Sequence, residues 1–99
     1  MPGMAKASAV RTILASVGRG GLNRSEDVRL VQELLNRHSR PSQPALVVHG
    51  VVDARTVAAI EAFQRRVLHV HRPDGRVDPG SPTFAALASQ VEQPSTPHE

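Results

Sequence analysis

Two aspartates occupy matching places in two similar stretches of the chain, and a pair of carboxylates could serve acid–base catalysis. Asp53 ends the run Gly50-Val-Val-Asp, and Asp78 ends the run Gly75-Arg-Val-Asp. General acid–base chemistry needs such groups at one site with pKa values suited to their tasks. Each aspartate, however, precedes a predicted helix, where its oxygen atoms can accept hydrogen bonds from first-turn amides. The pattern therefore favours a structural cap or turn role for both aspartates.

Four of the five histidines could contribute to a zinc site, because imidazole is a common zinc ligand. His69 and His71 are separated by one residue, so an extended segment places both rings on one side, and His38 and His49 could add ligands. The chain lacks the His-Glu-x-x-His pattern of a zinc-binding helix. Solvated or turn-stabilising histidines explain the pattern more simply, and we predict neither a metal site nor another cofactor.

Patterns for covalent or nucleotide chemistry are missing from the sequence. There is no cysteine, which excludes a disulfide, a thiolate metal site and a cysteine nucleophile. There is also no Gly-x-Ser-x-Gly elbow, and the glycine-rich run at 18–21 lacks the Lys-Ser/Thr ending of a phosphate-binding loop and has no good predicted strand before it. A sharp bend before the first helix explains these glycines better. We therefore predict no catalytic residues and no enzyme activity.

Composition predicts one small, mildly basic domain. Ninety-nine residues leave room for one core, and the net charge is +3, with eleven of the twelve cationic residues being arginine. Arginine suits bidentate contacts with carboxylates or phosphates. Two phenylalanines, without tryptophan or tyrosine, cannot form a broad platform for sugars or unpaired bases. No apolar run approaches the roughly 20 residues that cross a bilayer, and the apolar patch at 12–17 is too short for a signal peptide.

The elements that must position these residues centre on the run from Gly50 to Gln64. Helical spacing predicts a helix after Asp53 that continues to about Leu68. Its apolar stripe is Thr56, Ile60, Phe63 and Val67. A second copy of the same opening, turn, Gly-x-Val-Asp, threonine and helix, occupies residues 75–87. The repetition of glycine, valine, aspartate and threonine in one order indicates two related turn–helix units.

An earlier helix is predicted from about Asp27 to His38. Asn23, followed three residues later by Glu26, resembles a capping box, and Ser25 is the rival cap. The expected buried face consists of Val28, Val31, Leu34 and Leu35. The residues expected to face outward or onto a groove are Arg29, Gln32, Glu33, Asn36 and Arg37. This helix would pack beside the central one.

A third helix is predicted from Ser81 as its cap and Pro82 at its first position. Its apolar positions are Phe84, Leu87, Ala88 and Val91. A helix-turn-helix DNA reader needs polar or cationic residues near the start of its recognition helix, but residues 83–88 carry no cation. We therefore predict no nucleic-acid partner. The proline-rich run at 39–44 should be an exposed loop, and residues 46–48 could form a brief strand.

These elements predict an all-α fold, a small three-helix bundle with two repeated Gly-x-Val-Asp turn–helix units and short connecting segments. The domain should cover residues 11–92, where residues 11–17 lie on the core as an extended segment or as one or two helical turns. A flexible tail is expected at residues 1–10, and a linker or frayed tail at 93–99. The initial methionine favours a natural N-terminus, and the chain is either an excised domain or a complete small protein.

Three motifs occur together in this chain. They are Asp27-Val-Arg-Leu-Val-Gln-Glu-Leu-Leu-Asn36, then Gly50-x-Val-Asp53 with Thr56, Ala59-Ile60 and Phe63-Gln64, then Asp74-Gly-Arg-Val-Asp78 with Thr83 and Leu87. With them, the region from about Ile13 to Val91 resembles the three-helix type of peptidoglycan-binding domain, which accompanies cell-wall amidases, muramidases, zinc carboxypeptidases and phage endolysins. The resemblance implies a compact three-helix bundle and non-catalytic binding of murein that holds a partner enzyme near its substrate.

A murein site without tryptophan or tyrosine must rely on polar contacts, made by arginine and amide side chains to stem-peptide carboxylates and amides and to N-acetyl groups. We predict that the groove between the first two helices presents these side chains. The predicted ligand-binding residues are Gln32, Asn36, Arg55, Gln64 and Arg65. The alternative is that they are ordinary solvated residues of the helix surface.

Two functions therefore remain open. The first is a peptidoglycan-binding module, for stem peptide or glycan, that targets an attached or partner hydrolase or a secreted effector to the cell wall of a bacterial or phage lytic system. The second is a protein–protein interaction adaptor of the same fold that does not bind murein. For the first, we expect action at the cell wall or periplasm after delivery from the cytoplasm without a classical signal peptide, as by phage lysis or type VI secretion, and no membrane insertion.

Overall fold

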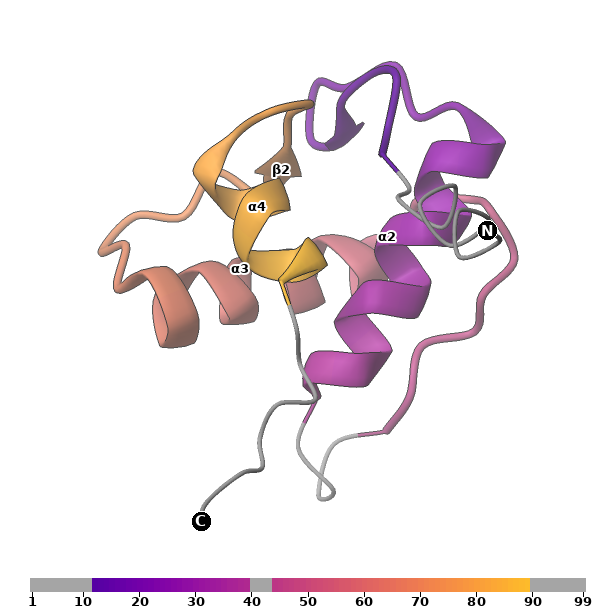
Figure 1. Ribbon diagram of the computed structural model, residues 1–99. Helices are drawn as coiled ribbons and strands as arrows, with labels where there is room; N and C mark the ends of the chain where they lie inside the picture. The colour runs from indigo at the N-terminus through magenta and orange to yellow at the C-terminus, as the bar shows by residue number, and fades with distance from the viewer. Residues whose placement is uncertain (1–11, 40–43, 90–99) are drawn as a thin grey trace, which may run out of the picture.

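Three helices and one short pair of strands form the part of the chain that the computed structural model describes, residues 12–39 and 44–89 (Figure 1). The helices are α2 (Ser25–His38), α3 (Ala54–Leu68) and α4 (Pro82–Ala88), and the strands are β1 (Val17–Gly18) and β2 (Arg76–Val77). The strands pair antiparallel, with Val17 opposite Val77 and Gly18 opposite Arg76. The predicted three-helix fold is confirmed, with a two-stranded addition that the sequence pattern did not predict.

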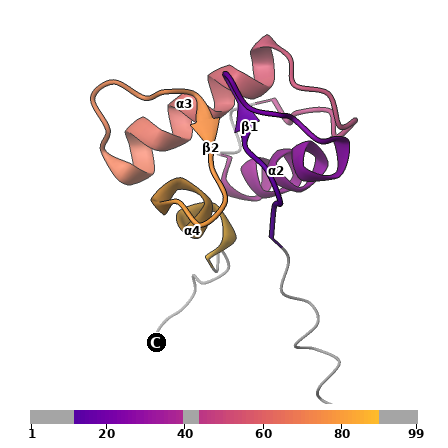
Figure 2. The ribbon, with the colours of Figure 1, turned by 90° about the horizontal axis from the view of Figure 1, so that it is seen from above.

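One hydrophobic core joins all five elements. Its buried members are Ile13, Val17, Val28, Leu30, Val31, Leu34, Leu35, Ile60, Phe63, Val77, Phe84 and Leu87. The strand pair lies at the top of the bundle in Figure 1 and toward the viewer in Figure 2, so β1 and β2 cover the core between the helices. Ile13 and Val17 are buried, and residues 12–17 form no helical turn, so the helical alternative for residues 11–17 does not hold in the described part of that segment.

Two helices begin where local chemistry predicts. The carboxylate of Asp53 accepts a hydrogen bond from the Thr56 amide at 2.9 Å, which caps α3. The Ser81 hydroxyl accepts one from the Phe84 amide at 3.1 Å, and Pro82 holds the first helical position of α4. Both caps satisfy amides that have no partner within their helix. The predictions for these two helix starts are confirmed.

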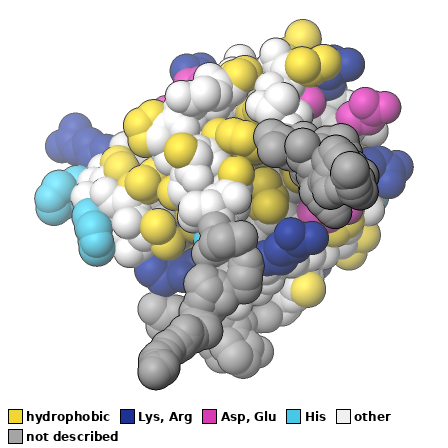
Figure 3. Space-filling view, viewed as in Figure 1, with side chains coloured by type: hydrophobic (Ala, Val, Ile, Leu, Met, Phe, Trp, Pro, Cys, Tyr) yellow, Lys and Arg dark blue, Asp and Glu magenta, His cyan; other side chains and the backbone are white. Residues whose placement is uncertain are grey.

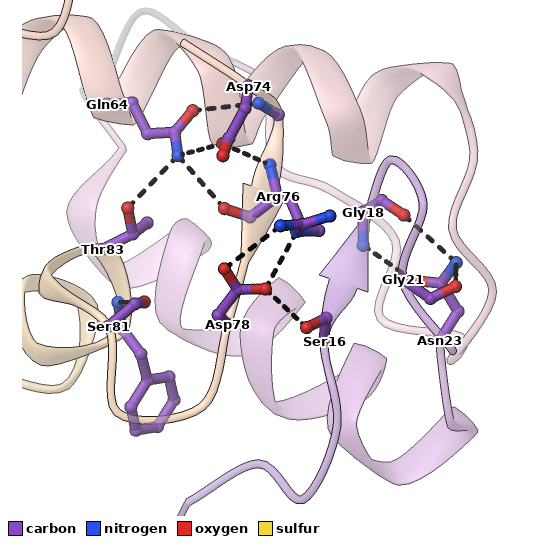
Figure 4. A network of polar contacts seen from close by, with 12 residues as sticks. Ser16, Gly18, Gly21, Asn23, Gln64, Asp74, Arg76, Asp78, Ser81 and Thr83 are labelled. Atoms are coloured by element: carbon purple, nitrogen blue, oxygen red, sulfur yellow. Dashed lines mark hydrogen bonds and ion pairs between the residues drawn. The ribbon is translucent and has the colours of Figure 1, made fainter.

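The predicted capping box of α2 is wrong. The residue before the helix is Arg24, and no side chain caps the first turn. Asn23 instead has a φ of 56° and lies one residue too early. Its amide group donates to the carbonyl oxygens of Gly18 and Gly21, and its Oδ1 accepts from the Gly18 amide at 2.7 Å (Figure 4). Asn23 therefore holds the glycine-rich bend that leads into the helix.

Three smaller expectations also need correction. Val67 is 38% exposed, so the buried stripe of α3 ends with Phe63 and Gln64. Residues 46–48 are irregular and form no strand. The glycine-rich run does follow a strand, β1, although this strand has only two residues. The tails at 1–10 and 93–99 lie outside the described residues, as does Val91.

The longest helix, α3, has 15 residues. Within residues 12–39 and 44–89, no helix combines the length and the apolar character that crossing a bilayer requires.

Candidate functional site

Gln32, one of the predicted groove residues, is fully buried beneath the turn before α3. Its Oε1 accepts hydrogen bonds from the amides of His49 and Gly50, both at 3.1 Å. Its Nε2 donates to the Val51 carbonyl and to the Thr56 hydroxyl, both at 3.1 Å. The expectation that Gln32 faces outward is wrong, because its polar atoms serve the backbone of this turn.

Gln64 performs the same task one unit later and is 4% exposed. Its Oε1 accepts from the Gly75 amide at 3.1 Å, and its Nε2 donates to the Arg76 carbonyl at 3.1 Å and to the Thr83 hydroxyl at 3.2 Å. Its Nε2 also lies 2.9 Å from a carboxylate oxygen of Asp74 (Figure 4). We call these two arrangements the glutamine clamps. Each pins a glycine turn to the helix before it, and neither leaves its glutamine open to a groove.

A groove does lie between α2 and α3, but it is lined by other residues. It has a volume of about 560 Å³. Its lining residues are Leu35, Asn36, Ser39, Pro44, Ala45, Leu46, Arg55, Ala58, Ala59, Ala62, Phe63 and Arg66. The α3 members recur at spacings of three and four residues, so they form one face of that helix. Alanines leave the groove open, because a larger side chain at these positions would fill it.

Most polar side chains of the groove are already hydrogen bonded within the domain. Asn36 donates to the Leu46 carbonyl at 3.0 Å and accepts from the Leu46 amide at 2.7 Å. The Ser39 hydroxyl donates to the Asn36 carbonyl at 2.9 Å. These bonds attach residues 44–46 to the end of α2 and so build one wall of the groove.

Two arginines carry the charge of the groove. Arg66 Nη2 donates to the His38 carbonyl at 3.1 Å, which places this guanidinium at the C-terminal end of α2. His38 is itself held by an Nε2 contact of 3.0 Å with the Leu87 carbonyl and by edge-on packing against Phe63. Arg55 is exposed and makes no hydrogen bond or ion pair with any residue that the structure describes. Among the described residues that line the groove there is no aspartate or glutamate.

Residues 24–87 match a known family described as “Putative peptidoglycan binding domain”. The chain belongs to this family. The matched region contains α2 and α3 in full, nearly all of α4, both glutamine clamps and every residue that lines the groove. Searches of curated proteins and of solved structures gave no significant match.

Of the five predicted binding residues of this peptidoglycan-binding-family domain, some line the groove and others do not. Asn36 and Arg55 line the groove. Gln32 and Gln64 are buried in the clamps, and Arg65 is exposed on α3 but outside the lining. The structure does not test ligand binding by any of them, so binding stays a prediction.

Sequence reasoning missed Arg66 and the alanine floor of the groove. A signal for them was present, because Arg55, Ala59, Ala62 and Arg66 follow helical spacing along one face. The polar side of a helix can be recognised from such a pattern. Arg65 and Arg66 point in directions about 100° apart around the helix. Which of the two faces the groove depends on the position of α2, which the sequence pattern does not give.

The two aspartates considered for catalysis have separate structural roles in this family member. The Thr56 amide and then the Thr56 hydroxyl hold the pKa of Asp53 below its usual value. Asp78 accepts from the Ser16 hydroxyl at 2.5 Å, and its Oδ1 lies 2.9 Å from Arg76 Nε (Figure 4). It therefore ties β1 to β2 and does not cap α4, which corrects the idea that both aspartates start helices in the same way.

The histidines are likewise dispersed over the fold. His49 Nε2 lies 3.5 Å from a carboxylate oxygen of Asp53, and His49 Nδ1 accepts from the Val51 amide at 3.2 Å. His69 adopts the left-handed conformation that ends α3. Among the described residues, no three histidine, aspartate or glutamate side chains gather in a way that could hold a metal ion.

Proposed function

We propose that this domain is a non-catalytic module that binds peptidoglycan through the groove between α2 and α3. We further propose that it keeps an attached or partner lytic enzyme, or a secreted effector, at the cell wall. The observation that carries this proposal is the coincidence of the family match at residues 24–87 with an open groove inside the same region. Clefts that combine an apolar surface with a few polar groups are the usual form of small-ligand sites.

The chemistry of the groove suits a peptide ligand better than a glycan. Sugar sites commonly stack a ring against an aromatic face, and Phe63, the one aromatic residue other than histidine in this lining, is 2% exposed. The stem peptide of murein carries methyl groups, amides and carboxylates. The alanines of α3 can contact the methyl groups, while Arg55 and Arg66 can pair with carboxylates.

Tethering explains how weak binding by so small a domain could matter. A module that binds the polymer raises the effective concentration of a linked or associated catalyst at its substrate. The proposed place of action is the cell wall or periplasm, with phage lysis or type VI secretion as candidate routes of delivery.

A sedimentation assay with purified insoluble murein tests the proposal. We expect the domain to sediment with murein and to stay in solution with an inert anionic polymer of matched charge density, which controls for simple adsorption. NMR titration with soluble muropeptides should then shift resonances of the groove residues, such as Ala58 and Ala62. Absence of binding in both assays would reject the proposal and favour a protein–protein adaptor of the same fold.

A further inference from the structure

We infer that the groove recognises stem peptides by their free carboxylates, so that it selects uncrosslinked, unamidated stems over stems whose carboxyl groups are blocked. This inference rests on the proposed function and specifies its ligand. Its basis is the set of hydrogen-bonding groups that the groove leaves unused.

Most of the unused donors in the groove belong to the arginines. Asn36 bonds to both backbone groups of Leu46 and keeps one amide N–H, and the Ser39 hydroxyl donates to the Asn36 carbonyl. Arg66 uses Nη2 for the His38 carbonyl, and its Nη1 and Nε have no partner among the described residues. Arg55 has all its donors available as far as the described residues go. A ligand must therefore offer acceptors, and carboxylates are the acceptors that best match a guanidinium.

The charge of the lining points the same way. Arg55 and Arg66 contribute two positive charges, and within residues 12–39 and 44–89 no acidic residue of the lining offsets them. On the face that Figure 3 shows, the cationic side chains are separated from one another and do not gather in one patch. An anionic ligand is therefore attracted to the groove, and a neutral, amidated one gains nothing from this field.

The spacing of the two arginines sets the length of the ligand. They are eleven positions apart on one face of α3, which at the helical rise corresponds to about 16 Å. An extended peptide covers that distance with about five residues. The alanine floor between the arginines accepts a backbone with small side chains. A stem pentapeptide has this length, small methyl side chains and several carboxylates, so different carboxylates could pair with the two arginines.

Crosslinking and amidation both remove a free carboxylate that the groove would bind. In a crosslink the amine of a second stem displaces the terminal residue of the donor stem, so one peptide bond is exchanged for another and the donor loses its terminal carboxylate with the released residue. Amidation instead turns a carboxylate into a neutral amide without a second stem. Each change removes a charged acceptor, and charge-assisted hydrogen bonds are roughly twice as strong as neutral ones. The domain would then mark regions of the wall that are rich in free stems.

The test compares one synthetic stem pentapeptide in two forms, with all carboxylates free and with all carboxylates amidated, by calorimetry at low and high salt. We expect the free form to bind at least about tenfold more tightly at low salt and to lose this advantage as salt screens the charges. Equal affinity for the two forms, or preference for the amidated one, would overturn the inference.

Variants locate the effect on the domain. Arg55→Gln and Arg66→Gln should each weaken binding of the free peptide by about tenfold and leave binding of the amidated peptide unchanged. The matched control is Arg72→Gln, which removes an equal charge from an exposed position that follows α3 and lies outside the groove lining. Arg55→Gln is the decisive variant, because Arg55 makes no hydrogen bond or ion pair with a described residue, and a thermal melt verifies that the variant folds. A loss of affinity equal in Arg55→Gln and Arg72→Gln would contradict the assignment.

Combined with the murein assay, the outcomes separate the two proposals. Sedimentation with murein together with equal binding of both peptides, or of neither, rejects the carboxylate inference and leaves the murein-binding function standing. No binding to murein and no binding to either peptide rejects the function itself. Filling the groove by Ala58→Leu should abolish binding of the free peptide, and unchanged affinity in this variant would place the ligand elsewhere.

Discussion

The two glutamine clamps use the same hydrogen bonds but serve surroundings that differ. In both, a helical glutamine accepts from a turn glycine, Gly50 or Gly75, and donates to the next carbonyl and to a helical threonine. The second turn is then covered by strand β1, because Val77 pairs with Val17. The first turn has no strand against it among the described residues, and Val51 is 62% exposed. The hydrogen bonds of the two clamps are therefore common to both turns and build the fold. The strand pairing differs, because β1 covers the second turn and leaves the first one open.

The helix starts differ as well. In the first unit, Asp53 both ends the Gly-x-Val-Asp motif and caps α3. In the second unit, Pro79 and Gly80 intervene, and the capping task passes to Ser81. Asp78 is thereby released to bond with Ser16 across the strand pair. One sequence motif thus supports two structural roles, and the three additional residues between Asp78 and its helix explain the difference.

Helix α3 belongs to both units and shows the contrast on its own surface. Its Gln64 side closes onto the second turn, whereas its Arg55, Ala59 and Arg66 side faces the groove. Stability and the proposed binding thus depend on different faces of one helix. Substitutions on the clamp face should change the free energy of unfolding, and substitutions on the groove face should change binding.

The largest expected effect is the loss of a clamp. Gln32→Met or Gln64→Met keeps the approximate length of the side chain but removes its hydrogen bonds, and turn amides and a threonine hydroxyl are left buried without partners. We expect each to lower the free energy of unfolding by about 2–4 kcal/mol, because several buried polar groups lose their partners together. Urea unfolding measures the change, with Arg65→Met as the exposed-helix control. A cost for one clamp less than half that for the other would show that the two clamps are not energetically equivalent.

The clamps also show where sequence reasoning stops. The N-terminal starts of α3 and α4 follow from local signals that act within a few residues. Examples are Asp53 as a cap and Pro82 at a first helical position. The polarity pattern of the helix predicts that Gln32 faces outward or onto a groove, because polar side chains usually lie on the solvent-facing side of a helix. Its partners lie in a turn about 18 residues away, and only the packing of two helices brings them together. The two glutamines stand at different distances from their glycines, 18 residues for Gln32 and 11 for Gln64, so the repeated pattern in the sequence does not indicate the clamps.

The sequence predicts a groove between α2 and α3, and the structure has a groove there whose lining includes Asn36 and Arg55 but not the other three predicted residues. Polar residues on two neighbouring helices suggest such a groove, whereas ligand binding by these residues stays a prediction. The role of Asn36 as a wall-building residue depends on the backbone of Leu46, which no local pattern specifies. The same holds for Arg66, whose position depends on the end of α2.

A moderate effect is expected from the cap that distinguishes the second unit. Ser81→Ala removes the acceptor for the Phe84 amide and should lower the free energy of unfolding by about 1 kcal/mol. Ser25→Ala is the matched control, because Ser25 is exposed in the first turn of α2 and caps nothing. It should change stability by less than about 0.5 kcal/mol. Equal costs in the two variants, measured by urea unfolding, would contradict the assignment of Ser81 as the cap.

The smallest expected effect is a pH dependence that both units share. Hydrogen bonds from Thr56 hold the pKa of Asp53 below its usual value, and the side-chain amide of Gln64, with the Arg76 amide, does the same for Asp74. Because both folded-state pKa values are lower than the ordinary 3.8, the stabilisation is present above about pH 4 and is lost as the pH falls through the folded-state values. Both groups are largely exposed, so solvent screening keeps the effect small.

Asparagine variants measure this dependence unit by unit. Asp53→Asn keeps a side-chain oxygen that can cap α3 but cannot ionise, so it should melt close to the parent protein at pH 7 and lose less melting temperature than the parent between pH 5 and pH 2. Asp74→Asn should likewise flatten the acid branch, and the double variant should flatten it further, because the two carboxylates lie in separate turns. An acid branch of unchanged steepness in the double variant would show that neither turn aspartate links the fold to pH, and that the hydrogen bonds at both turns do not distinguish the ionised from the protonated carboxyl group.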